Sequence, residues 1–150
     1  MNLRNQLKSS SAQSHARLDR ELSDFGPFKD PTRYRIFLNL MLKLHQRCGS
    51  SLAYVESEIE LPSRNRSLED LIRSDLLTLV HDESEARDLQ DDPRSGASTK
   101  SAETMWGEAY VMEGSAMGGK MMYRQAESLL PQEFGRDYLR QLSFDAGKRW

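Results

Sequence analysis

Three histidines are the residues best suited to chemistry, and one of them has an informative neighbourhood. His15 stands four residues before Asp19, which puts the imidazole and the carboxylate on one side of a helix. A carboxylate there can hold one ring nitrogen and leave the other neutral and free to ligate a metal. Lys8 adds a cation near the same face. The alternative is a partly exposed histidine that makes a simple pair with Asp19.

Glycines interrupt a later stretch that otherwise favours helix. Gly107, Val111, Gly114 and Gly118 share one helical face, and Gly119 follows directly. Each glycine inside a helix costs roughly 0.5–1 kcal/mol relative to alanine. The pattern indicates either two helices packed closely through small residues, or a bend and a bare face that suits a flat, rigid body.

The remaining candidate groups are typical of structural roles. His45 follows apolar residues at helical steps and is expected at the core or its edge, while His81 is expected at a helix end. Cys48, the single cysteine, is expected to be a small buried side chain. Neither a disulfide nor a multi-ligand zinc site is predicted. Five methionines indicate adaptable core packing or, beside a large apolar ligand, a pocket wall: Met105, Met112, Met117, Met121 and Met122.

Composition limits the classes of partner. The 150 residues carry a net charge of −2, so no basic field would attract nucleic acid or an anionic membrane. No run reaches the ~18 apolar residues of a membrane span. The first residues lack the apolar segment of a signal peptide. We expect a cytoplasmic protein of one domain.

Helical spacing of apolar residues runs through nearly the whole chain, and no useful stretch alternates as a strand does. Asp30 is expected to cap a helix with Pro31 at its first position, and Ser67 to open another within a capping box. The sequence predicts an all-α fold, a single compact bundle of about six helices. The expected helices cover residues 2–23, 32–58 (with 49–51 as a candidate interruption), 67–80, 82–90, 101–130 and 131–142, with a loop at 91–98.

Two apolar surfaces are expected to face the interior. Residues 36–42 are apolar nearly all round, which predicts burial in the core. In the first helix, Leu7, Leu18 and Leu22 share a face with His15, which would place that ring on an inward side.

Two motifs at opposite ends of the chain carry a resemblance. The segment Leu7-Lys8 with His15-Ala16-Arg17-Leu18-Asp19 resembles the first helix of heme oxygenases, and Tyr110-Val111-Met112-Glu113-Gly114-Ser115-Ala116-Met117-Gly118-Gly119 resembles their glycine-rich distal helix. Residues 66–79 are similar to the middle helix of that family, and the likeness is greatest to the bacterial enzymes found with phytochromes. The resemblance implies an all-α bundle with heme sandwiched between the first helix and a kinked glycine-rich helix. Residues 1–150 would form one such domain without the family's last C-terminal helix.

The resemblance implies roles for three residues on the proximal side of the heme. His15 would be the axial ligand to the heme iron, and Asp19 matches the acidic position that steadies that ligand. Lys8 matches the basic residue that meets a heme propionate.

Four further residues would form the distal side. Gly114 and Gly118 match the positions where the backbone crowds the porphyrin face, and Gly119 would allow the bend. Ser115 stands where animal enzymes carry an aspartate that orders distal water, so the proton network would be built differently here.

The activity that the resemblance implies is cleavage of heme, as substrate and cofactor, by O₂ at a meso carbon to biliverdin, carbon monoxide and ferrous iron. Electrons would come from a partner such as a ferredoxin or a flavin reductase, and a bacteriophytochrome would receive the biliverdin. Two other hypotheses stand beside it. One is a non-catalytic heme-binding or partner-binding protein of the same fold, and the other is a plain helical scaffold whose glycines serve helix contact.

Overall fold

Helices form nearly all of the described structure, a computed structural model that describes residues 3–61, 66–79, 99–146 and 148. Within these residues there is no strand, which confirms the all-α prediction. The expected helix 82–90 and the loop 91–98 lie outside the described residues. The elements are α1 (Leu3–Phe25), α2 (Pro31–Glu58), α3 (Leu68–Leu77), α5 (Ala102–Ser115), the 3₁₀ turn η1 (Ala116–Gly118), α6 (Gly119–Leu129) and α7 (Asp137–Asp145).

Side-chain caps begin three of the helices. The carboxylate of Asp30 accepts the backbone N–H of Arg33 at 2.9 Å, and Pro31 occupies the first position of α2. Ser67 accepts backbone N–H groups at the start of α3, and Ser101 does the same for α5. The predicted caps at Asp30 and Ser67 are confirmed. They could be predicted because each cap involves only residues that are close in the sequence.

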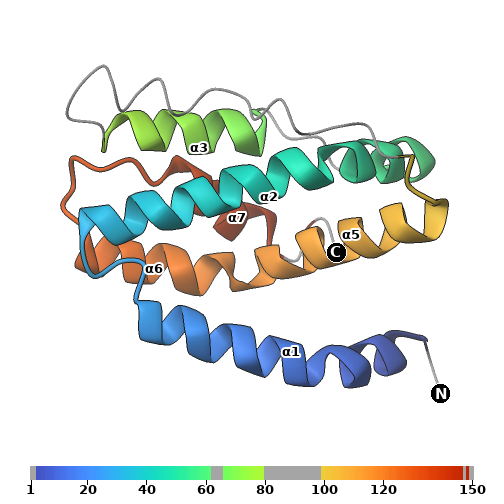
Figure 1. Cartoon of the computed structure of the whole chain (residues 1–150). Coiled ribbons are helices and arrows are strands. Elements are labelled where there is room, and N and C mark those ends of the chain that lie inside the picture. Colours follow the sequence, from blue (N-terminus) through green and yellow to red (C-terminus); the bar gives the residue numbers. More distant parts are fainter. Residues whose placement is uncertain (1–2, 62–65, 80–98, 147, 149–150) are drawn as a thin grey trace.

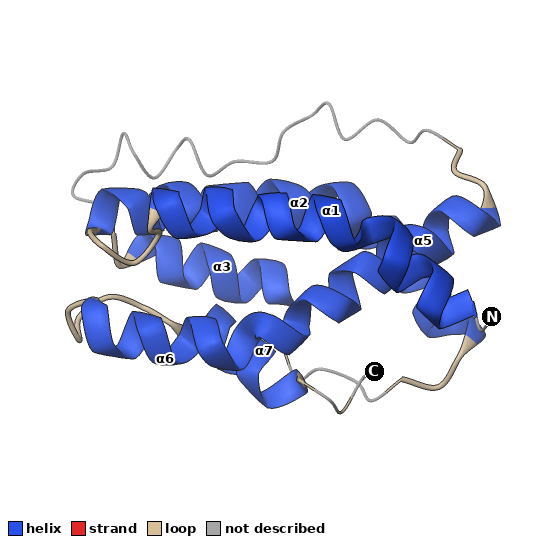
Figure 2. Cartoon of the chain, turned by 90° about the horizontal axis from the view of Figure 1, so that it is seen from below, coloured by secondary structure: helices blue, strands red, loops and turns tan. Residues whose placement is uncertain are grey.

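The helices run back and forth along one axis (Figure 1). Helix α2 runs opposite to α5, η1 and α6, whereas α1 runs in the same direction as these three elements. Helix α3 lies beyond α2, and α1 lies beyond α5 and α6 on the other side. Viewed from below, α1 passes in front of α2, with α6 and α7 to one side (Figure 2). None of the described helices has the length and hydropathy needed to cross a bilayer.

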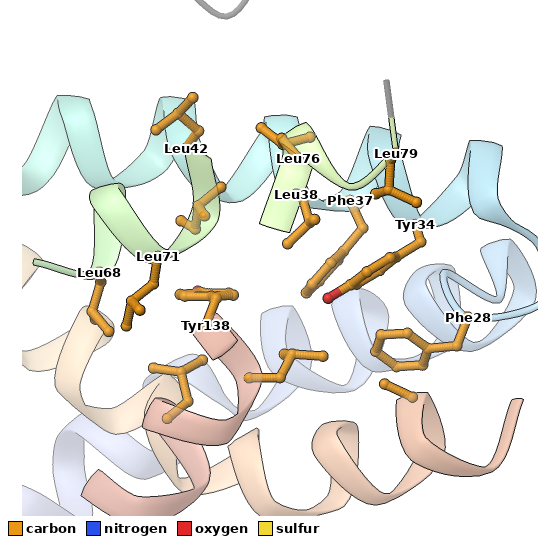
Figure 3. Packing of buried hydrophobic residues seen from close by; sticks show 14 of the residues in the cluster. Phe28, Tyr34, Phe37, Leu38, Leu42, Leu68, Leu71, Leu76, Leu79 and Tyr138 are labelled. Atoms are coloured by element: carbon orange, nitrogen blue, oxygen red, sulfur yellow. The ribbon is translucent and has the colours of Figure 1, made fainter. Parts of the chain in front are cut away.

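The core is built by α2, α3, α6 and α7 (Figure 3). At one end, the rings of Phe28, Tyr34 and Phe37 have centroids 5.7–6.4 Å apart. Further along, Leu71 and Tyr138 continue the cluster between α3 and α7. Burial of such side chains is the main favourable term in folding. Helix α1 contributes to this core only through Leu22 and Phe25, which pack against its edge.

The last helix begins later than predicted. We expected it to start at Pro131, but residues 131–136 form turns and α7 starts at Asp137. Both oxygens of the buried Asp75 carboxylate accept backbone N–H groups of α7, from Asp137 at 3.0 Å and from Tyr138 at 2.9 Å. Because this cap comes from α3, no local pattern around Pro131 could reveal it.

The other boundaries differ from expectation in smaller ways. Helix α2 continues through Gly49 without a break, and the last residue of α3 is Leu77 rather than about Val80. The expected glycine-bearing helix 101–130 is divided into α5 and α6 by the 3₁₀ turn η1 at residues 116–118.

Candidate ligand site between α1 and the glycine-rich helices

The glycines of α5, η1 and α6 do not all serve the same purpose. A Cβ atom placed on Gly119 would lie 2.6 Å from the Leu142 Cβ of α7, so this glycine permits close helix packing. A Cβ atom on Gly107 or Gly114 would meet nothing within 4 Å, and one on Gly118 would only touch the Met122 side chain at 3.9 Å. Close helix contact therefore accounts for Gly119 and leaves the other three unexplained within the described residues.

Exposed apolar side chains surround these three open glycines. Val111, Met117 and Met121 are each more than half exposed, although they stand on helices with a buried opposite side. We call the strip formed by Gly107, Val111, Gly114, Met117, Gly118 and Met121 the glycine face. At about 1.5 Å per residue it is roughly 20 Å long. Exposed apolar surface of this extent is typical of a place where something binds.

A second exposed apolar strip lies on α2. Ile36, Leu40 and Leu44 follow one another at steps of four residues, and Leu40 is 55% exposed. Leu44 shares a hollow of about 280 Å³ with Gly107 and Val111, so the two strips adjoin at this point. Because α2 runs opposite to α5 and α6 (Figure 1), Leu40 and Ile36 come before Leu44 on the part of α2 that lies toward the end of α6.

This α2 strip corrects the prediction that residues 36–42 are buried all round. Phe37, Leu38 and Leu42 are buried in the core as expected, but Ile36 and Leu40 are exposed. The physical reason is that α2 has core packing on one side only. The other side faces the space toward α1.

Helix α1 is attached to the rest of the molecule at its C-terminal end. Leu22 and Phe25 pack against the core, and the Arg33 guanidinium donates to the Phe25 carbonyl at 2.8 Å. Gly26 then turns the chain with a φ of +60°, a conformation that favours glycine. The chain enters α2 a few residues later.

The rest of α1 projects away from the core, which corrects a further prediction. His15 and Leu18 were expected on an inward side, yet both are exposed, Leu18 to 61%. Nothing among the described residues covers this face of α1 except near Leu22. There, Asp19 and Leu22 line a hollow of about 500 Å³ together with Met121 and other residues of α6.

The position of His15 follows from this hollow. Asp19 and Met121 line it from opposite sides, and α1 and α5–α6 run in the same direction (Figure 1). His15 is four residues before Asp19 on the same side of α1, about 6 Å back along the axis. Gly118 and Gly114 precede Met121 by roughly 4.5 and 10 Å. From this hollow, His15 and these two glycines are both displaced toward the end of the molecule where α1 and α5 begin.

The polar groups expected around the ligand are only partly arranged. Among the described residues, the side chains of His15 and Asp19 form no hydrogen bond, so the expected orienting contact is not made. Lys8 is exposed toward the N-terminal end of α1. The Ser115 hydroxyl donates to the Met112 carbonyl of its own helix at 2.8 Å, with its oxygen still able to accept.

Other polar groups are used in helix packing. His45 is buried and its Nε2 lies 3.2 Å from the Tyr138 hydroxyl, which confirms the structural interpretation. Cys48 is also buried as predicted, and burial raises the pKa of its thiol. Between α2 and α5, the Glu108 carboxylate accepts from Lys100 at 2.7 Å and from Ser51 at 2.5 Å.

Sequence reasoning missed two features of the molecule. Ile36, Leu40 and Leu44 could have been recognised, because their spacing repeats on a helix that already has another apolar side. The burial of Asp75 could also have been recognised from the sequence, because this residue stands on the apolar face of α3 beside Leu71 and Leu76.

The residues present fit a flat apolar ligand with one metal centre. The glycine face leaves open the space that Cβ atoms would fill, and the exposed His15 on α1 offers a single imidazole. The described residues hold no cluster of three or more histidine, cysteine, aspartate or glutamate side chains placed for a metal ion. No known protein family, no curated protein and no solved structure matches the chain.

Proposed function

We propose that this protein is a heme oxygenase that binds heme between α1 and the glycine face. The observation that carries the proposal is the pair of open glycines, Gly114 and Gly118, whose added Cβ atoms would meet no packed neighbour. Helix contact does not account for these glycines in the described structure, and a planar ring lying against bare backbone would. The resemblance of the same two segments to heme oxygenases points to heme as the planar ring.

Bound heme would supply the iron that activates O₂ and the meso carbon that is oxidised, with electrons from a ferredoxin or a flavin reductase. The imidazole of His15 would hold the iron from one side. On the other side, bare backbone at Gly114 and Gly118 leaves room for O₂. Exposed apolar side chains of four helices and η1 would cover the ring and exclude bulk water: Leu18, Ile36, Leu40, Val111, Met117 and Met121.

The remaining polar residues would act around this centre. Asp19 would orient His15 once α1 settles on the ligand, and Lys8 would pair with a propionate. The oxygen of Ser115 can accept a hydrogen bond from a water on the distal side, while its proton is engaged with Met112. Gly119 would keep the 3₁₀ turn in place through its contact with α7.

A heme titration followed by turnover tests the proposal. The purified chain should take up one heme with the spectrum of histidine-ligated iron, and reductant with O₂ should convert it to biliverdin. His15→Ala should lose that spectrum, and added imidazole should restore it, because free imidazole can occupy the position of the deleted ring. Failure to bind heme would contradict the proposal.

A non-catalytic heme-binding protein is the second candidate. The hydrogen bond from Ser115 to the Met112 carbonyl favours it, because that proton is not available to a distal water. The same experiment separates the two candidates. A Soret band that persists through incubation with reductant in air would show binding without cleavage.

A further inference from the structure

We propose that Arg47 binds a carboxylate of the ligand at the end of the glycine face where α5 begins. The inference rests on the proposed function and identifies which edge of the porphyrin points to which end of the site. Heme carries its two propionates on one edge, so a cation at one end of an apolar site would fix the orientation of the ring.

The first argument is the position of Arg47. It lines the hollow of about 280 Å³ that also contains Leu44, Gly107 and Val111. These three neighbours belong to the two apolar strips, so the guanidinium lies where both strips end. An exposed arginine at this place can reach a ligand edge while its aliphatic stem covers apolar surface.

The second argument is charge. The carboxylate that shares the hollow, Glu108, accepts from Lys100 and Ser51 on one oxygen, Oε2, so its charge is already balanced by Lys100, and Arg47 acts on it only as a more distant positive charge. Among the described residues, the Arg47 guanidinium takes part in no ion pair or hydrogen bond; only its backbone carbonyl accepts, from Lys100 at 2.8 Å. A planar guanidinium of this kind binds a carboxylate through two parallel hydrogen bonds.

The third argument is the contrast with the other end. The hollow of about 500 Å³ beside Met121 carries one carboxylate, Asp19, and one ammonium, Lys29, so the two charges balance there. The N-terminal part of α1, which includes Lys8, lies toward the same end as the start of α5 in both views (Figures 1 and 2). Both cations would thus favour an acidic edge at the Arg47 end.

The test compares heme with its dimethyl ester, in which both propionates are uncharged. Arg47→Gln should weaken heme binding about tenfold, the loss expected for a charge-assisted hydrogen bond, and leave the affinity for the ester unchanged. Arg66→Gln is the matched control, because that exposed arginine lines hollows beside α3, away from α1. It should change neither affinity.

Two results would overturn the inference while leaving the proposed function intact. Arg47→Gln could bind heme as tightly as the wild type, or it could lose equal affinity for heme and the ester, which would indicate a change in packing. A wild-type chain that binds neither porphyrin would overturn both the inference and the proposed function. Circular dichroism of each variant would check that the fold is kept.

Discussion

Gly118 and Gly119 are neighbours in the chain but answer to different constraints. Gly119 meets α7 so closely that a Cβ atom would lie 2.9 Å from the Leu142 carbonyl carbon, whereas Gly118 faces open space apart from one flexible methionine. A glycine required by the fold and a glycine that the fold does not require thus stand side by side. Because packing does not require a glycine at position 118, contact with a ligand is the better explanation for it.

Alanine substitutions should separate the two kinds of glycine. Gly119→Ala should lower the free energy of unfolding by about 1–3 kcal/mol, because the added methyl group overpacks the contact with α7. Gly114→Ala should leave the ligand-free protein unchanged or more stable by about 0.5 kcal/mol, since alanine favours helix and no clash arises. Urea denaturation measures both changes.

Heme binding gives the matching functional result for Gly114. Its alanine variant should bind heme more weakly than the wild type despite the equal or higher stability, because the methyl group occupies space that the ring would use. Loss of stability in this variant would show that Gly114 is required for folding. The explanation by ligand contact would then be unnecessary.

At the scale of elements, Asp75 joins α3 to α7. Burial raises the pKa of this carboxyl to about 6 from an ordinary 3.8, against the lowering effect of the N–H groups of Tyr138 and Asp137. The folded state therefore binds a proton more tightly than the unfolded state. The contribution of Asp75 to stability should be greatest below pH 4 and decline as the pH rises to about 6.

Comparison with Asp75→Asn isolates this contribution. The amide can accept only one of the two N–H groups, so the variant should be less stable than the wild type by about 1–3 kcal/mol at low pH. The difference between the two proteins should shrink between pH 4 and 6. Parallel stability curves in thermal or urea unfolding would show that Asp75 keeps one ionisation state throughout.

Local signals account for the elements that the sequence predicts well. Asp30, Pro31 and Ser67 act on backbone within three residues of themselves, so the start of α2 and α3 could be read directly. The start of α7 could not, because its cap comes from Asp75, some sixty positions earlier. Periodicity identified most helices, and tertiary contacts decided where the last one begins.

The candidate site was predicted to a similar extent. The open glycines and His15 were recognisable from spacing, and the 3₁₀ turn at residues 116–118 lies where the glycines cluster. The spacing of Leu40 and Leu44 shows that α2 has a second apolar side, but it does not show which of the two sides the core takes. Exposure of that second side required the arrangement of α1, α2 and α5.

At the scale of the whole molecule, α1 is the least supported helix. Only its last turns, at Leu22 and Phe25, pack on the core, and nearly all of its described side chains before residue 21 are exposed. Amides of residues 5–20 should therefore exchange with solvent faster than those of α2 in the ligand-free protein. Bound heme should slow their exchange by about tenfold or more, because His15 would then be fixed to the iron.

Hydrogen–deuterium exchange measured with and without heme checks this expectation. The amides of α3 serve as an internal control, since that helix lies beyond α2 and away from the ligand (Figure 1). Strong protection of residues 5–20 before heme is added would contradict it. His15→Ala should show little change in α1 on addition of heme.

The contact between Gly119 and Leu142 affects which helix can move when a ligand binds. Helix α7 packs directly against the backbone at Gly119, so this segment cannot move when a rigid, flat ligand contacts its opposite side. Helix α1, on the other side of the ligand, has no such packing along most of its described length. On the proposed function, α1 would move toward the ligand while the segment at Gly119 stays in place, because α1 packs on the core only near Leu22 and Phe25.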